Sequence, residues 1–342
     1  MMKKIKYFLV TLLSLPLLVL SGCSCKDDDG LTKLTVAEVT HSVFYAPQYV
    51  AASKGFFEEE GLKVTFVNTN GADKTMAALL SKDAQIGLMG SEASIYVYNE
   101  GQKDYAINFA QLTQKDGSFL VGRENVENFD ISMLEGSEIL GGRLAGMPEM
   151  VLEYILKNAG LEVGVDDDSK DVNVRTDVQF AAMAGAFTSG EGDYVSLFEP
   201  TASSLEKANH GHIVASLGAL SGNIPYTSYS TLKSYMNKNS ETIQKFTNAI
   251  YKAQIWVYEH SDLEVAEAIH SYFSDTSVED LKVAVKNYRD IEAWAKDPTL
   301  TVESLNKLMD IIELAGQLDK RAPYDKIVTT EYARNAIESV ID

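Results

Sequence analysis

The spacing of apolar positions predicts alternating strands and helices over the first third of the chain. Three short apolar runs have the pattern of buried strands, and they cover residues 34–39, 62–68 and 85–89. One helix is expected from about Ala72, and another from Ser91 to Gly101. Strands and helices that alternate at this spacing indicate right-handed βαβ units on a mainly parallel sheet.

The same alternation begins again after two extended runs, at residues 105–112 and 118–122. Further strands are expected at residues 138–141, 171–175, 193–198 and 212–217, with helices at residues 147–158, 178–187 and 201–208. Beyond about Tyr235, apolar residues recur every three or four positions, which predicts a mostly helical C-terminal region.

This repeated pattern predicts an α/β protein of two lobes. Residues 31–114 are expected to form the first part of lobe 1 and residues 115–221 to form lobe 2, while residues 222–342 return to lobe 1 and add the C-terminal helices. The chain would then cross between the lobes near residues 113–118 and again near residues 219–225. Lobes joined by short hinges typically close on a ligand held between them, so a ligand cleft is expected there.

A candidate for one half of that ligand site lies near the start of lobe 1. The first strand is followed by the aromatic turn Phe44-Tyr45, and Pro47 opens the helix after it. A strand end that leads into a helix N-terminus leaves backbone N–H groups free, and small ligands bind at such places in open α/β sheets. We therefore expect this turn to contact a ligand.

The first 30 residues have the pattern of an export signal and a tether. Lysines 3, 4 and 6 precede an apolar run over residues 8–20, which is typical of a secretory signal peptide over residues 1–22. Leu20-Ser21-Gly22-Cys23 is similar to the lipobox of bacterial lipoproteins, so Cys23 is expected to be acylated and to begin a tether over residues 23–30. An uncleaved anchor or an ordinary signal is the alternative, and it would leave Cys23 unexplained. The expected location is the extracytoplasmic face of the cell membrane.

Charge and side-chain inventory exclude several classes of function. The net charge of −19 disfavours nucleic acid as a partner, because an acidic surface repels phosphate backbones. The only cysteines are Cys23 and Cys25, so the folded part has no disulfide and no thiol nucleophile. His210 and His212 lack a third ligand nearby, and residues 141–146 do not fit a phosphate-binding fingerprint. No metal and no cofactor are therefore expected.

The lipobox, the acidic tether and the residues around the aromatic turn together resemble a known family. The turn region reads Tyr45-Ala46-Pro47-Gln48-Tyr49-Val50-Ala51, followed by Lys54-Gly55-Phe56-Phe57-Glu58-Glu59-Glu60-Gly61-Leu62. This order resembles solute-binding lipoproteins of ABC importers, in the NMT1-like branch for nitrate, sulfonates, taurine and thiamine-pyrimidine precursors. The resemblance implies the type II periplasmic-binding-protein fold, a small-molecule ligand, and ABC permease and ATPase subunits as partners. A monomer without enzymatic activity is expected.

Carried over position by position, the resemblance implies a set of ligand contacts. In lobe 1 these are the turn Phe44-Tyr45 and the helix start Ser91-Glu92; in lobe 2 they are the helix start at Met147 and Glu149, and Glu199 after a strand. His41 is a further candidate, because it lies at the strand end beside the aromatic turn. Pyrimidine-binding relatives usually have Asn-His where this chain has Phe44-Tyr45, so a different specificity is expected.

Each of these residues also has a purely structural alternative. Phe44 could be a core residue, with Tyr45 packing on it at the helix start. The carboxylates of Glu92, Glu149 and Glu199 could offset helix dipoles instead of meeting a ligand. His41 could hold a strand-end hydrogen bond.

Three functions are weighed on these grounds. The leading one is capture of a small heteroaromatic or amino-bearing solute, similar to a thiamine-pyrimidine precursor, for import. Acidic side chains would repel a bare anion. The alternative is a binding protein for a small anion such as an aliphatic sulfonate, taurine or nitrate. A pyrimidine-synthase-like enzyme is disfavoured, because those enzymes carry a cysteine-rich motif and both cysteines here lie in the tether.

Overall fold

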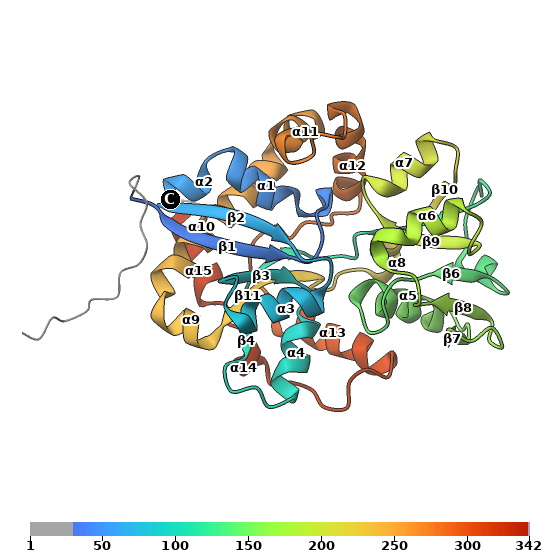
Figure 1. The fold of residues 1–342 in the computed structure, drawn as a ribbon, viewed down its shortest axis with the longest axis horizontal. Helices are drawn as coiled ribbons and strands as arrows, with labels where there is room; N and C mark the ends of the chain where they lie inside the picture. Colours follow the sequence, from blue (N-terminus) through green and yellow to red (C-terminus); the bar gives the residue numbers. More distant parts are fainter. Residues whose placement is uncertain (1–29, 341–342) are drawn as a thin grey trace, which may run out of the picture.

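The computed structural model describes residues 30–340 and shows two β-sheets in separate halves of the molecule (Figure 1). The predicted signal peptide and most of the tether, including Cys23, lie outside the described residues. In the described part, no helix is both long and apolar enough to cross a membrane.

The first sheet has five strands in the order β2-β1-β3-β11-β4. Their bounds are β1 Thr32–Glu38, β2 Leu62–Asn68, β3 Ile86–Met89, β4 Ala106–Thr113 and β11 Thr227–Leu232. β1 runs parallel to β2 and β3, whereas β11 runs antiparallel to both β3 and β4. The sheet is therefore mixed, and the strand that makes it so comes from far along the chain.

The second sheet has six strands in the order β10-β5-β9-β6-β8-β7. Their bounds are β5 Ser118–Gly122, β6 Glu138–Leu140, β7 Val163–Val165, β8 Val172–Arg175, β9 Tyr194–Phe198 and β10 His212–Ser216. The pairs that involve β6, β7 and β8 are parallel, and β5 is antiparallel to both of its neighbours.

Helices cover both sheets and form most of the C-terminal region. Around the first sheet they are η1 Val43–Tyr45, α1 Ala46–Ser53, α2 Phe56–Glu59, α3 Ala72–Ser81 and α4 Glu92–Asn99. Around the second they are η2 Ile131–Leu134, α5 Met147–Asn158, η3 Phe180–Ala182, α6 Met183–Thr188, α7 Thr201–Lys207 and α8 Leu217–Ser221. The rest are α9 Lys233–Lys238, α10 Ser240–Glu259, α11 Asp262–Ile269, η4 His270–Tyr272, α12 Val278–Asp290, α13 Val302–Leu314, α14 Tyr324–Ile327 and α15 Glu331–Val340.

Two segments carry the chain between the sheets, and they are joined to each other. The first crossover, residues 114–117, leads from β4 to β5, and the second crossover, residues 222–226, leads from α8 to β11. The Ile224 N–H donates to the Gln114 carbonyl at 2.9 Å, and the Thr113 and Thr227 hydroxyls lie 2.6 Å apart. The crossovers therefore lie side by side between the two halves.

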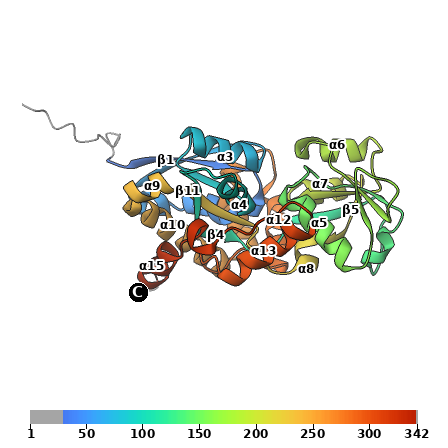
Figure 2. The ribbon, with the colours of Figure 1, turned by 90° about the horizontal axis from the view of Figure 1, so that it is seen from below.

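C-terminal helices also span the junction. α12 packs on η1 of the first half and on α7 of the second, and α13 packs on α4 and α5. Figure 2 shows α12 and α13 between the two halves. A protein built this way can hold a ligand at the junction while residues from both halves meet it.

Candidate functional site

The turn at the start of α1 lies against the second half of the molecule. The Ser42 hydroxyl accepts the Phe44 N–H at 3.2 Å, which caps η1, and donates to the Glu199 carbonyl at 2.8 Å. Because Ser42 is buried, both bonds are shielded from water. The aromatic turn is thus held at the junction by a contact that crosses from one half to the other.

Phe44 packs within an aromatic cluster at this junction. Its ring centroid lies 5.3 Å from that of Phe198, 5.6 Å from Tyr226 and 5.1 Å from Tyr288. A side chain at Gly117 would place its Cβ 2.7 Å from the Phe44 ring, so the first crossover passes close to it. Phe44 is fully buried, as its core alternative requires.

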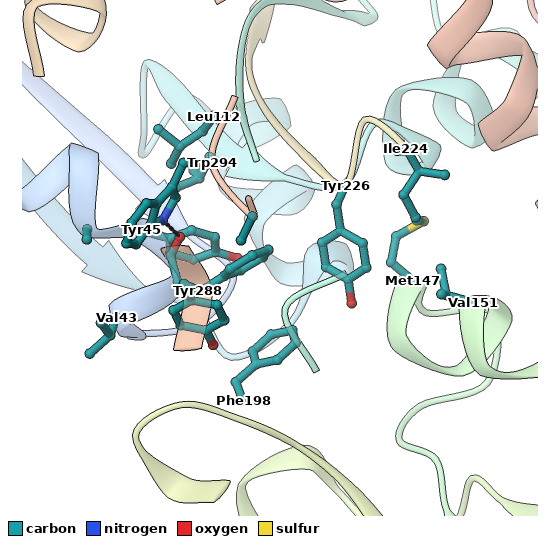
Figure 3. Packing of buried hydrophobic residues seen from close by; sticks show 14 of the residues in the cluster. Val43, Tyr45, Leu112, Met147, Val151, Phe198, Ile224, Tyr226, Tyr288 and Trp294 are labelled. Atoms are coloured by element: carbon teal, nitrogen blue, oxygen red, sulfur yellow. Dashed lines mark hydrogen bonds between the residues drawn. The ribbon is translucent and has the colours of Figure 1, made fainter. Parts of the chain in front are cut away.

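Figure 3 shows Tyr226 between two groups of side chains, with Tyr45, Tyr288 and Phe198 on one side and Met147, Val151 and Ile224 on the other. The labelled rings come from both halves and from the second crossover. The junction is thus lined by flat apolar faces, with a hydroxyl on each tyrosine.

Tyr45 and Glu92 bring polar atoms to this apolar junction. The Tyr45 hydroxyl and Glu92 Oε2 are buried, and neither has a hydrogen-bond partner within residues 30–340. Burial raises the pKa of Glu92 to about 7, and Arg143 opposes the shift. Burial also raises the pKa of Tyr45, to which the charges of Glu38 and Glu92 add. Both groups are thus held neutral at moderately acidic pH.

Three further polar groups at the junction were not among the predicted contacts: Asp116, Ser118 and Tyr226. Asp116 Oδ2, the Ser118 hydroxyl and the Tyr226 hydroxyl are all buried and lack a partner in the described part of the chain. Burial raises the pKa of Asp116 to about 7, and the neighbouring Ser118 and Tyr226 hydroxyls oppose the shift. Burial also raises the pKa of Tyr226 well above its usual value, to which the charges of Asp116, Tyr45 and Glu92 contribute.

The start of α5 brings Met147 and Glu149 from the second half. Both are buried, with the Ala145 N–H donating to Glu149 Oε2 at 3.0 Å and Glu149 Oε1 left without a partner among the described residues. Burial, followed by the neighbouring Glu153, raises the pKa of Glu149 well above the usual range. Tyr96 of α4 donates to Met150 Sδ at 3.6 Å, so α5 meets the first half here.

Glu199 has protein partners for both carboxylate oxygens. Oε1 accepts the Ser203 hydroxyl and the Asn287 amide, each at 2.6 Å, and Oε2 accepts the Ser203 N–H at 3.0 Å. These bonds join the start of α7 to α12. The arrangement is that of the structural alternative, a carboxylate at a helix N-terminus.

His41 and Ser91 also have protein partners. His41 Nδ1 lies 2.9 Å from Glu38 Oε1, its Nε2 lies 2.8 Å from the Tyr272 carbonyl, and its ring stacks on Phe273. The bond to Glu38 is the main reason that the pKa of His41 is raised. The Ser91 hydroxyl lies 2.8 Å from that of Ser228 on β11. Both residues support the first half rather than offering unused polar atoms.

Within the described residues, the polar groups that remain without partners at the junction are carboxyls and hydroxyls: those of Tyr45, Glu92, Asp116, Ser118, Glu149 and Tyr226. Arg143, which is exposed, is the base that acts on Glu92. Over residues 30–340, no group of three or more His, Cys, Asp or Glu side chains is placed to hold a metal ion. The junction is suited to a solute that donates hydrogen bonds.

Three comparisons place this chain among known proteins. The sequence model of the NMT1-like family matches residues 31–270. YtlA of Bacillus subtilis (strain 168), a candidate binding protein, is 48% identical over 316 residues, covering 92% of this chain and 93% of that protein.

Solved structures share the two-lobed fold of periplasmic binding proteins. The alkanesulfonate-binding protein SsuA from Xanthomonas axonopodis pv. citri, bound to MOPS, has a TM-score of 0.70 at 14% identity, covering 87% of this chain and 98% of that one. The periplasmic nitrate-binding protein NrtA from Synechocystis PCC 6803 has a TM-score of 0.69 at 14% identity, covering 91% and 89%.

Proposed function

This chain belongs to the NMT1-like family, and we propose that it is an extracytoplasmic solute-binding lipoprotein of an ABC importer. It would capture one small solute between its two lobes and deliver it to a membrane permease driven by an ATPase subunit. A lipid on Cys23 would hold it at the membrane, and it would act as a monomer. No chemical turnover is part of the proposal.

One observation carries the proposal of a ligand site between the lobes. Buried polar atoms without partners in the described part of the chain gather where the halves meet, and they come from η1, α4, α5, β5 and both crossovers. Burying a polar group without a hydrogen bond is unfavourable by about 1–3 kcal/mol. Several such groups at one junction are best explained by a solute that satisfies them when it binds.

The hydrogen-bonding groups and flat faces of the junction favour an amino-bearing, flat solute. Carboxyls of Glu92, Asp116 and Glu149 attract N–H donors, and the aromatic faces can stack on a ring, which adds about 0.5–1.5 kcal/mol beyond burial. A small anion such as an aliphatic sulfonate, taurine or nitrate is the alternative. SsuA and NrtA have the same fold, but a sequence identity of 14% does not imply that this chain binds the same ligands.

Among the predicted contacts, we infer that Tyr45 and Glu92 meet the solute from lobe 1, and that Met147 and Glu149 meet it from lobe 2. The unpartnered atoms of Tyr45, Glu92 and Glu149 support this assignment. So do the places of Glu92, Met147 and Glu149 at the starts of α4 and α5. Phe44 would act by packing the rings that form the wall. Glu199, His41 and Ser91 would act indirectly, because their polar atoms already bind protein groups.

Native mass spectrometry of the purified protein tests the function directly. A co-purified small molecule at one copy per chain is expected, and its mass separates an amino heterocycle from a sulfonate. Binding should also raise the melting temperature in proportion to the logarithm of free ligand. The Tyr45→Phe variant should bind more weakly. No saturable binding from a whole metabolite extract would contradict the proposed function.

A further inference from the structure

The two crossovers each carry a buried polar side chain with an unused atom. Asp116 lies on the first crossover and Tyr226 on the second, and Ser118 follows directly at the start of β5. Asp116 and Ser118 are fully buried and Tyr226 is nearly so. We name these three side chains the crossover corner.

The Asp116 carboxylate is fixed in orientation by its own turn. Oδ1 accepts the Ser118 N–H at 2.6 Å, which leaves Oδ2 as the oxygen without a partner in the described chain. The backbone there is also tightly packed, because a Cβ at Gly218 would lie 2.2 Å from the Asp116 carbonyl. Oδ2 is therefore a preorganised acceptor rather than a mobile surface carboxylate.

The second crossover holds Tyr226 against the same place. The bond from Ile224 to Gln114 and the contact between Thr113 and Thr227 join the two segments on either side of the corner. The Tyr226 ring packs edge-on against Phe44 and against Phe198. Its hydroxyl therefore has a fixed position beside the Ser118 hydroxyl, and the charges that raise its pKa are those of Asp116, Tyr45 and Glu92.

The corner offers a chemically defined set of contacts. Asp116 Oδ2 accepts one hydrogen bond, and the two hydroxyls can each accept or donate. No Lys, Arg or His side chain is among the groups that act on Asp116 in the described structure. An anion would bring its charge next to a buried carboxyl with no base to balance it, which is unfavourable.

We propose that Asp116, with Tyr226 and Ser118, is the specificity-determining corner of the site, that it binds the amine or amidine edge of a planar solute, and that it excludes anions. This inference rests on the proposed function, because it assumes that a solute binds between the lobes. The corner includes residues of both crossovers, so a solute bound there contacts the two segments that connect the lobes.

A matched pair of variants tests the corner. Asp116→Asn keeps the Oδ1 acceptor for the Ser118 N–H but replaces the free acceptor with a donor. Asp130→Asn is the control, because Asp130 accepts the Ser132 N–H at 3.0 Å in the same Asp-x-Ser turn, on the exposed surface of lobe 2. Circular dichroism and melting curves establish that each variant is folded, and Tyr226→Phe serves as a second corner variant if Asp116→Asn does not fold.

The probes are benzamidine and 4-aminopyrimidine as N–H donors, pyrimidine as the ring without the amine, and methanesulfonate and nitrate as anions. Calorimetry and thermal shift should show binding of a donor-bearing probe to the unaltered protein and to Asp130→Asn. That binding should weaken at least tenfold in Asp116→Asn or Tyr226→Phe, and pyrimidine should bind more weakly than 4-aminopyrimidine.

Two positive binding results, and one negative result, would overturn the corner without contradicting the proposed function. One is saturable binding of methanesulfonate or nitrate in preference to both donor probes. The other is a donor probe, or a co-purified solute, that binds Asp116→Asn and Tyr226→Phe as tightly as the unaltered protein. If neither donor probe binds while the metabolite extract gives saturable binding, the proposed corner is also wrong, whereas failure of the extract itself contradicts solute binding altogether.

Discussion

The Trp294 indole N–H donates a hydrogen bond to the Phe44 carbonyl at 3.0 Å. This bond links the segment after α12 to the aromatic turn, across 250 residues of sequence. Both residues are essentially fully buried, so the bond forms away from water. The C-terminal region therefore helps to hold the turn that carries Tyr45 at the junction of the lobes.

Replacing Trp294 by Phe should lower the free energy of unfolding by about 1–3 kcal/mol, because it removes this bond and part of a buried ring. Urea unfolding followed by circular dichroism measures the change. Trp256→Phe is the matched control. Trp256 stacks on His260 at a surface groove, so this substitution should lower the free energy of unfolding much less. Equal destabilisation by the two substitutions would contradict the role assigned to Trp294.

Trp294 should also report ligand binding. The chain has two tryptophans, and Trp294 lies near the rings of the junction while Trp256 does not. A solute that binds beside Tyr45 should change the fluorescence of the unaltered protein and of Trp256→Phe. The change should disappear in Trp294→Phe. A signal that follows Trp256 instead would place the solute elsewhere.

Substitution of Glu199 distinguishes a structural role of this residue from direct contact with the ligand. Glu199→Gln weakens the acceptor for Ser203 and Asn287, so we expect a loss of about 1–2 kcal/mol in stability. Solute affinity should change less than about threefold by our structural assignment, because no carboxylate oxygen remains free. Asn287→Ala should have a similar effect on stability. A tenfold or greater loss of affinity in Glu199→Gln alone would restore the direct contact that the family resemblance implies.

Periodicity predicted most elements, and packing between distant segments explains the ones it missed. Residues 147–158 were predicted as a helix and form α5 with the same bounds, because Pro148 marks its start and apolar residues follow at helical spacing. The strand β11, Thr-Ser-Tyr-Ser-Thr-Leu, was not predicted. Its serine and threonine side chains do not form an apolar pattern, yet all six residues are buried. Inside the sheet, the Ser228 and Ser230 hydroxyls donate hydrogen bonds to Asn108 Oδ1.

The segment predicted as a helix over residues 178–187 was only partly right. A short η3 begins at Phe180, and the α-helix α6 starts at Met183. Gly185 and the small residues around it give little apolar periodicity, so the sequence could not locate the start.

The sequence pointed to part of the proposed site but not to the proposed crossover corner. Tyr45, Glu92 and Glu149 were predicted from helix starts, and each has a buried polar atom without a partner in the part of the chain described. Asp116 lies between the extended runs predicted at residues 105–112 and 118–122, and its residue type alone does not mark it as a ligand contact. Burial is what distinguishes it from the exposed Asp130 turn, and burial depends on the second crossover, more than 100 residues later.

The lipid anchor gives a prediction outside the described residues. Cys23→Ser should move the protein from the membrane fraction to the soluble or secreted fraction, because a single residue carries the lipid in the proposed processing. Cys25→Ser should leave it at the membrane, and mass spectrometry of the mature N-terminus identifies the modified cysteine. Membrane retention of Cys23→Ser would contradict the lipoprotein assignment.

The buried carboxyls make a prediction about pH. Burial raises the pKa of Glu92 and of Asp116 to about 7 in the folded protein, whereas carboxyls in an unfolded chain titrate near 4. Between these values the folded state binds more protons than the unfolded state. The stability that this difference provides is fully present below about pH 4 and is lost as pH rises through about 7.

Glu149, whose pKa is raised to about 9, adds to the same effect. Ligand-free protein should therefore lose stability from pH 5 to pH 8, by at most about 1.4 kcal/mol per pH unit for each of these three carboxyls. Glu92→Gln removes one of the three carboxyls and should reduce the slope by up to about a third, whereas Glu124→Gln, at an exposed carboxyl of the second half, should leave the slope unchanged. Urea unfolding at several pH values measures both slopes. A solute that donates an N–H to Asp116 Oδ2 favours the ionised carboxyl, so its affinity should rise with pH over the same range. Stability that increases from pH 5 to pH 8, or an unaltered slope in Glu92→Gln, would show that these carboxyls are not buried as the structure describes.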